Sequence, residues 1–152
     1  MNLALYAPER VKKIVLLSPV AAFVSWNKMY LLLRFVPLML FPIRLFINNS
    51  IRPMFVKRPT EIFFEQMALA AKCKFKEVFP TEFTDDELRQ IKAPTLLLIG
   101  EKEVIFSAPK AIDRAKRLMQ DIQAEKVPEA SHLSSMDQPE MVDARILKFL
   151  KE

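Results

Sequence analysis

Two side chains suited to proton transfer follow two apolar stretches near the C-terminal end of the chain. Glu103 comes three residues after the end of "TLLLIG", and His132, the only histidine, comes after "AEKVPEAS". If both stretches are neighbouring parallel strands, both side chains lie over the same sheet edge. A carboxylate can then accept a hydrogen bond from one imidazole nitrogen, which fixes the tautomer and leaves the other nitrogen as a base. We therefore take Glu103 and His132 as the candidate catalytic residues.

Other nucleophilic side chains have simpler interpretations. Ser18 ends the first predicted strand and could line the same cleft. Ser134 and Ser135 lie on the turn into a helix, where capping or solvent exposure is the expected role. Cys73 lies between two lysines, which can activate a thiol, but its helical surroundings "ALAAKCKF" predict packing instead.

Composition excludes several classes of protein. The chain has one glycine, so neither a dinucleotide-binding fingerprint nor a Walker loop is possible. Its single cysteine rules out an internal disulfide and argues against a cysteine-based metal site, so we expect no cofactor and a reducing, cytoplasmic location. The N-terminus has no signal-peptide pattern. The longest uncharged run, Ile14 to Asn27, has 14 residues, short of the roughly 18 that a membrane span needs.

The charge is unevenly distributed. Residues 1–80 hold 12 Lys/Arg and 4 Asp/Glu, whereas residues 81–152 hold 11 and 14. The basic residues of the first part are scattered among leucine and phenylalanine rather than clustered. This pattern favours a solvated rim around an apolar surface over a nucleic-acid site.

The chain divides into three parts. In residues 1–24, a helix that Pro8 ends precedes a buried strand from Ile14 to Leu17. Residues 25–92 predict several short helices and no strand, because prolines at 37, 42, 53 and 59 limit helix length. Thr84 and Glu87 match a capping box at the start of a short helix.

Residues 93–152 alternate between strand and helix. A strand from Thr95 to Ile99 ends at Gly100, and a helix with Ser107 as its cap and Pro109 in its first turn follows. "AEKVPEA" predicts a short strand. The last helix is expected to begin with Asp137 and Glu140 as a capping pair. The pattern as a whole predicts an α/β fold with a parallel sheet.

These segments resemble the C-terminal part of the α/β-hydrolase fold. "ALYAPERVKKIVLLSP" is similar to the segment that follows the nucleophile helix and leads into the sixth strand. "IKAPTLLLIGEKE" is similar to the seventh strand, with Glu103 at the position of the catalytic acid. "VPEASHLSSMDQPEMVDARILKFL" is similar to the eighth strand, histidine turn and last helix, with His132 at the catalytic histidine. Ser131 replaces the glycine that usually precedes the histidine.

The resemblance implies a three-stranded parallel sheet from residues 1–24 and 93–152, a remnant of the complete fold, with residues 25–92 as a helical cap. It implies a carboxylesterase-like or lipase-like serine hydrolase acting on a small ester or acyl substrate. The family's Gly-x-Ser-x-Gly elbow cannot exist in a chain with one glycine. We therefore expect the chain alone to be inactive.

The alternative is a truncated, non-catalytic module that acts by binding or oligomerisation, or a protein that binds a membrane surface. The strand at residues 14–17 would present an unpaired apolar edge, because its usual neighbour is absent from the sequence. Such an edge predicts a homo-oligomer, most simply a dimer that buries the open edge or the cap. We expect neither a nucleic-acid nor a membrane partner.

Overall fold

The computed structural model describes residues 1–41, 43–70, 73 and 82–152. Its sheet has three parallel strands in the order β1–β2–β3: β1 (Ile14–Leu17), β2 (Thr95–Gly100) and β3 (Ile122–Val127). The helices are α1 (Asn2–Tyr6), η1 (Pro8–Arg10), α2 (Lys28–Leu40), α3 (Arg44–Ile51), η2 (Arg52–Met54), α4 (Glu61–Ala70), α5 (Asp85–Gln90), α6 (Ala108–Leu118), α7 (Ser134–Asp137) and α8 (Pro139–Lys151). The prediction of an α/β fold with a three-stranded parallel sheet is confirmed.

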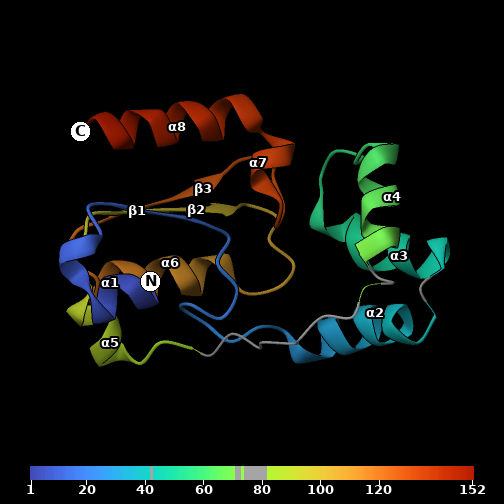
Figure 1. Cartoon of the computed structure of the whole chain (residues 1–152), viewed down its shortest axis with the longest axis horizontal. Coiled ribbons are helices and arrows are strands. Elements are labelled where there is room, and N and C mark those ends of the chain that lie inside the picture. Colours follow the sequence, from blue (N-terminus) through green and yellow to red (C-terminus); the bar gives the residue numbers. More distant parts are fainter. Residues whose placement is uncertain (42, 71–72, 74–81) are drawn as a thin grey trace.

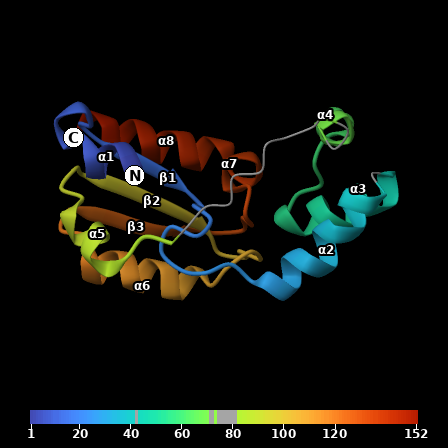
Figure 2. The ribbon, with the colours of Figure 1, turned by 60° about the horizontal axis from the view of Figure 1, so that its bottom comes forward.

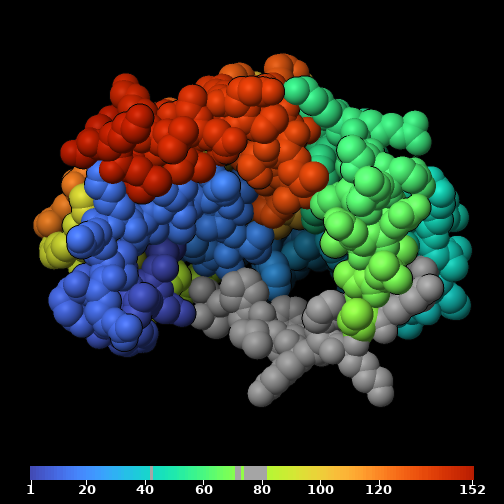
Figure 3. All heavy atoms as spheres, turned by 45° about the horizontal axis from the view of Figure 1, so that its top comes forward, coloured from blue at the N-terminus to red at the C-terminus, as the bar shows by residue number. Residues whose placement is uncertain are grey.

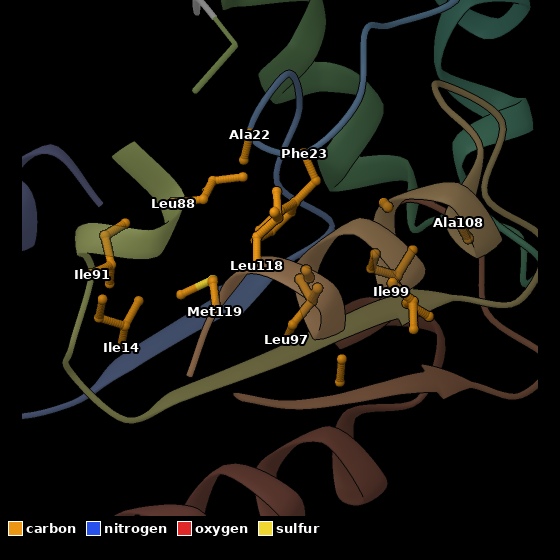
Figure 4. Close-up of a cluster of buried hydrophobic side chains, with 14 of the residues drawn as sticks. Ile14, Ala22, Phe23, Leu88, Ile91, Leu97, Ile99, Ala108, Leu118 and Met119 are labelled. Atoms are coloured by element: carbon orange, nitrogen blue, oxygen red, sulfur yellow. The ribbon is translucent and has the colours of Figure 1, made fainter. Parts of the chain in front are cut away.

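Helices cover both faces of the sheet (Figures 1 and 2). Successive side chains of the central strand β2 point to opposite faces, and every residue of β2 is buried. Leu97 and Ile99 pack in the cluster that includes residues of α5 and α6, shown in Figure 4. Leu96 and Leu98 pack on the other face with residues of α8. Full burial of each such side chain stabilises the fold by about 1.5–3 kcal/mol, which explains why this run is apolar without alternation.

The strand register brings the carboxyl ends of β2 and β3 to the same sheet edge. Thr95 pairs with Ile122 at one end of the two strands and Gly100 with Val127 at the other. The turns that follow the two strands, residues 101–107 (the acid turn) and residues 128–133 (the histidine turn), therefore leave the sheet side by side. This adjacency was the condition for bringing Glu103 to His132.

Residues 25–92 form helices and, within the described residues, no strand. Helices α2, α3 and α4 lie beyond the carboxyl ends of the strands (Figures 1 and 2). They have a small apolar cluster of their own, made of Ile47, Ile51, Phe55 and Phe64. Helix α5 packs under the sheet instead, through Leu88. Its capping box forms as predicted, with Glu87 N–H donating to Thr84 Oγ1 and Thr84 N–H donating to the Glu87 carboxylate.

Three local predictions were wrong. The prolines were expected to limit helix length, but Pro37 lies inside α2, which has 13 residues. The carbonyl of Leu33 loses its helical partner there, and because Leu33 is exposed, water can solvate that group. Strand β3 begins at Ile122 and ends at Val127, because the chain then turns, with Glu129 at a φ of 49°. Helix α6 starts after Ser107 as predicted, but the Ser107 side chain makes no capping hydrogen bond.

The length of a helix determines whether it can cross a membrane. Within the part of the chain that the structure describes, no helix is both long and apolar enough to cross a bilayer.

Candidate active site

Glu103 and His132 meet at the edge of the sheet where β2 and β3 end. The Nδ1 atom of His132 lies 3.0 Å from Glu103 Oε1 and 2.9 Å from Oε2. The Glu103 side chain is fully buried and the His132 side chain is 16% exposed. Because a carboxylate only accepts hydrogen bonds, this contact places the ring hydrogen on Nδ1 and leaves Nε2 as the acceptor. The arrangement can hold a base in one tautomer and stabilise its protonated form.

Backbone groups hold the buried carboxylate in place. Glu103 Oε1 also accepts from the N–H groups of Val104 at 3.0 Å and Ile105 at 2.9 Å. A buried carboxylate without such partners would be very unfavourable, so these bonds stabilise it and fix its position. The Phe106 ring meets the imidazole edge-on, with centroids 6.3 Å apart and planes at 87°. The acid turn therefore supplies the carboxylate, its donors and an aromatic wall.

The acid turn and the histidine turn are in direct backbone contact. The N–H groups of Glu101 and Lys102 donate to the carbonyls of Val127 and Ala130, each at 2.9 Å. A Cβ on Gly100 would lie only 2.1 Å from the Ser131 carbonyl oxygen, so only glycine fits. This contact explains why the single glycine of the chain lies at the end of β2.

An ion pair also bridges the two turns. Lys102 Nζ lies 2.6 Å from Glu129 Oε2. The hydrogen bond to Glu129 raises the pKa of Lys102 above its ordinary value. Both side chains are at least half exposed, so this pair adds little to stability compared with the backbone contacts.

An apolar cavity of about 520 Å³ lies beside His132. Its other lining residues are all apolar and come mainly from α2, α4 and the segment around Met54, including Phe35, Leu38, Met54, Phe63, Met67 and Leu133. His132 is the only ionisable side chain among the described lining residues. A cavity of this size and character can hold an apolar group of a small molecule next to the imidazole.

Tyr30, on α2, is electrostatically coupled to the acid. Burial raises the pKa of Tyr30, nearby Arg34 lowers it, and the negative charge of Glu103 raises it further. The Tyr30 hydroxyl is buried and makes no hydrogen bond with the described residues. Sequence reasoning missed this residue because nothing in "WNKMYLLL" distinguishes a tyrosine near the site from one in an ordinary helix face.

Sequence reasoning also misjudged Asp137. It was expected to cap the last helix with Glu140, but the cap position of α8 is Gln138, with no side-chain bond. The Asp137 carboxylate is fully buried and accepts hydrogen bonds from Ser131 and from Val56 and Lys57. Two of these partners lie about 80 residues away in sequence, so no local pattern could reveal them.

The other candidate nucleophiles do not join the Glu103–His132 pair. Ser18 is buried at a φ of 40°, and its hydroxyl has no hydrogen-bond partner among the described residues. Ser134 is buried in the same unpartnered way, so the expectation of capping or exposure was wrong for it; Ser135 is half-buried. Cys73 is exposed, so the expected packing was also wrong, and the flanking lysines lie outside the described residues. Among the residues described, no three His, Cys, Asp or Glu side chains are placed to hold a metal ion.

Comparison with known sequences gives two relatives from Bacillus subtilis (strain 168). The chain is 34% identical over 155 residues to the uncharacterized carboxylesterase nap, covering 98% of this chain and 52% of that protein. It is 36% identical over 159 residues to the carboxylesterase YbfK, covering 99% of this chain and 53% of that protein. No protein-family model matches the chain.

Solved structures give the same result. The naproxen esterase (carboxylesterase NP) from Bacillus subtilis superposes with a TM-score of 0.87 at 30% identity, covering 98% of this chain and 54% of that one. A meta-cleavage product hydrolase from Pseudomonas fluorescens superposes with a TM-score of 0.80 at 15% identity, which shows a shared fold alone. The chain spans about half the length of the curated relatives it matches, and it matches their C-terminal half.

Proposed function

We propose a function from the premise that this chain belongs to the α/β-hydrolase fold family and corresponds to its C-terminal part. The chain supplies the acid, Glu103, and the base, His132, of a serine carboxylic ester hydrolase. The nucleophilic serine and the oxyanion hole come from residues outside this sequence, so the chain alone has no turnover. The observation that carries this proposal is the paired contact of His132 Nδ1 with both Glu103 oxygens.

The geometry supports a definite division of roles. With Nδ1 bonded to Glu103, His132 Nε2 can take the proton of a serine hydroxyl as its oxygen attacks the ester carbonyl. The carboxylate stabilises the resulting imidazolium. The imidazolium then protonates the departing alcohol. In the second half-reaction His132 takes a proton from the attacking water and returns it to the serine oxygen as the acid leaves. Glutamate is an accepted third member in this fold.

The cavity supports a substrate with an apolar group. Because His132 is the only ionisable side chain among its described lining residues, a charged group placed there would lose its hydration without a compensating partner. We propose that the ester presents an apolar acyl or alcohol group to this cavity. No cofactor takes part in the proposed reaction.

The isolated chain provides the first test. We expect the purified 152-residue protein to show no saturable hydrolysis of p-nitrophenyl butyrate, and the His132→Ala variant to give the same background rate. Saturable turnover that disappears in His132→Ala would contradict the proposal, because it would mean that this chain holds its own nucleophile. The DNA upstream of the first codon gives an independent check: an open frame encoding Gly-x-Ser-x-Gly would support a nucleophile encoded there.

A second candidate function is a non-catalytic oligomeric module, and the outer edge of β1, where no strand of the described residues pairs, favours it. The N–H groups of Ile14 and Ser18 bond to the segment of β2, so those of Val15 and Leu17, which alternate with them, point to the open edge. Leu17 is 39% exposed. In Figure 3 the blue N-terminal segment forms part of the surface beside the red α8. Such an edge invites pairing with another strand.

We expect the chain to form a homodimer at micromolar concentration, measured by size-exclusion chromatography with light scattering. Leu17→Lys should shift the population to monomer if the β1 edge is the interface, because a charge on the edge opposes strand pairing. Leu147→Lys, at a 56% exposed site on α8, is the matched control and should leave the dimer intact. A stable monomer in the unchanged protein would refute the idea; a dimer lost only on Leu45→Lys would place the interface on the cap helices.

The proposed partners and location rest on the composition. We propose no nucleic-acid or membrane partner, because the basic residues are scattered. We propose a cytoplasmic location, because Cys73 is the only cysteine and is not paired within the chain.

A further inference from the structure

Asp137 gathers three backbone N–H groups onto one buried carboxylate. Its side chain is fully buried. Oδ1 accepts from Val56 N–H at 3.0 Å and from Lys57 N–H at 2.9 Å, while Oδ2 accepts from Ser131 N–H at 2.9 Å and from Val56 N–H at 3.0 Å. Charge-assisted bonds of this kind are the strong ones, and in a buried site they fix geometry. Oδ1 bonds only to the segment of residues 53–57, here called the anchor segment, whereas Oδ2 bonds both to this segment and to the histidine turn.

Further bonds tie the anchor segment to both neighbours of His132. On one side, the Ser131 hydroxyl lies 3.0 Å from the carbonyl oxygens of Pro53 and Lys102. On the other, Leu133 N–H donates to the Met54 carbonyl at 3.1 Å. The histidine turn is therefore held between the acid turn and the anchor segment, and His132 lies at the centre of this frame.

We propose that Asp137 is a positioning residue that holds the anchor segment and the histidine turn together. In this role it keeps the His132 ring on Glu103 and keeps Met54 and Leu133 at the wall of the apolar cavity. Helices α2 to α4 would accordingly be fixed at residues 53–57. The meaning of this frame for catalysis rests on the proposed function, but the frame itself does not.

The chemistry of the site requires an acceptor on both oxygens. Asparagine has nearly the same shape, but its NH₂ group would face at least one of the three N–H donors and could not accept from it. Either the bond to Ser131 or the bond to Lys57 would be lost, while Val56 N–H, which lies 3.0 Å from both oxygens, could keep one acceptor. An unpaired buried donor is costly, so the two segments should separate locally.

The test compares Asp137→Asn with Asp143→Asn, which makes the same chemical change at an exposed position of α8. Because His132 is the only histidine, the imidazole nitrogen signals of ¹⁵N-labelled protein need no assignment. We expect one tautomer, with the hydrogen on Nδ1, in the unchanged protein and in Asp143→Asn, and a mixture of both tautomers in Asp137→Asn. Hydrogen exchange of the amide that loses its acceptor, Lys57 or Ser131, should rise about 10- to 100-fold in Asp137→Asn alone.

An unchanged tautomer in a folded Asp137→Asn protein would overturn the proposal, whatever the amides do. If that variant does not fold, hydrogen exchange of the unchanged protein tests the proposal instead. There the amides of Val56, Lys57 and Ser131 should exchange with similar, strong protection, since they share one buried acceptor. Exchange of Val56 and Lys57 at the rate of exposed amides would overturn the proposal. Neither measurement depends on ester turnover, so failure of the proposed function would leave this test intact.

Discussion

A chimeric protein that joins the N-terminal half of the carboxylesterase YbfK to this chain is expected to hydrolyse p-nitrophenyl butyrate, and His132→Ala should reduce its kcat/KM by about 10⁴-fold or more. YbfK is 36% identical to this chain, and the chain covers 53% of YbfK. The N-terminal half of YbfK should therefore carry a sheet edge that fits β1 of this chain. Without the imidazole, the serine keeps its proton and remains a poor nucleophile. The measurement is the initial rate over a range of ester concentrations.

The acid is tested in the same chimera. Glu103→Gln keeps the size of the side chain but removes the charge that stabilises the imidazolium, and kcat should fall by roughly 10³- to 10⁴-fold. Glu140→Gln, at an exposed position of α8, is the matched control and should change kcat less than about twofold. If His132→Ala retained the activity of the unmodified chimera, the assignment of this chain as the base-bearing half would be wrong.

Gly100→Ala is expected to destabilise the chain by about 3 kcal/mol and to disturb the Glu103–His132 contact. The new Cβ would lie 2.1 Å from the Ser131 carbonyl oxygen and 2.6 Å from that of Ala130. Both obstacles are backbone atoms, so no side-chain rotation can relieve the clash. The acid turn and the histidine turn would have to separate, breaking the bond from Lys102 N–H to the Ala130 carbonyl.

Urea denaturation measures this loss as a lower midpoint with an unchanged slope. The tautomer of His132 gives a second, local readout, since separation of the turns weakens the bond that fixes it. Ser25→Thr also adds one methyl group but at an exposed site outside the helices and strands, and its stability should match the unchanged protein within about 0.5 kcal/mol. Equal stability of Gly100→Ala and the unchanged protein would show that the two turns are not packed as tightly as the structure has them.

The sequence predicted the strands and the helix start that depend on residues close together in the chain. The strand at Ile14–Leu17 and the strand starting at Thr95 could be recognised because a run without alternation is typical of a strand buried on both faces. The expected burial holds for the second strand, but in the first only Ile14 is buried and Leu17 is exposed. The capping box of Thr84 and Glu87 depends on residues three apart, so it was readable too. The positions of Glu103 and His132 after two strands predicted their contact, on the condition that these strands are neighbours in the sheet.

The adjacency of the two strands, and every contact between residues distant in sequence, was decided by the tertiary structure. Only the order β1–β2–β3 made the two turns neighbours. Asp137 read as a helix cap because a local pattern fits it, yet its partners at positions 56 and 57 lie across the fold. The sequence indicated only that Gly100 ends a strand. The structure shows why the residue is glycine, because the carbonyl of Ser131 packs against it. Local patterns encode interactions within a few residues, while a buried acid or a lone glycine is explained only by the atoms that folding brings beside it.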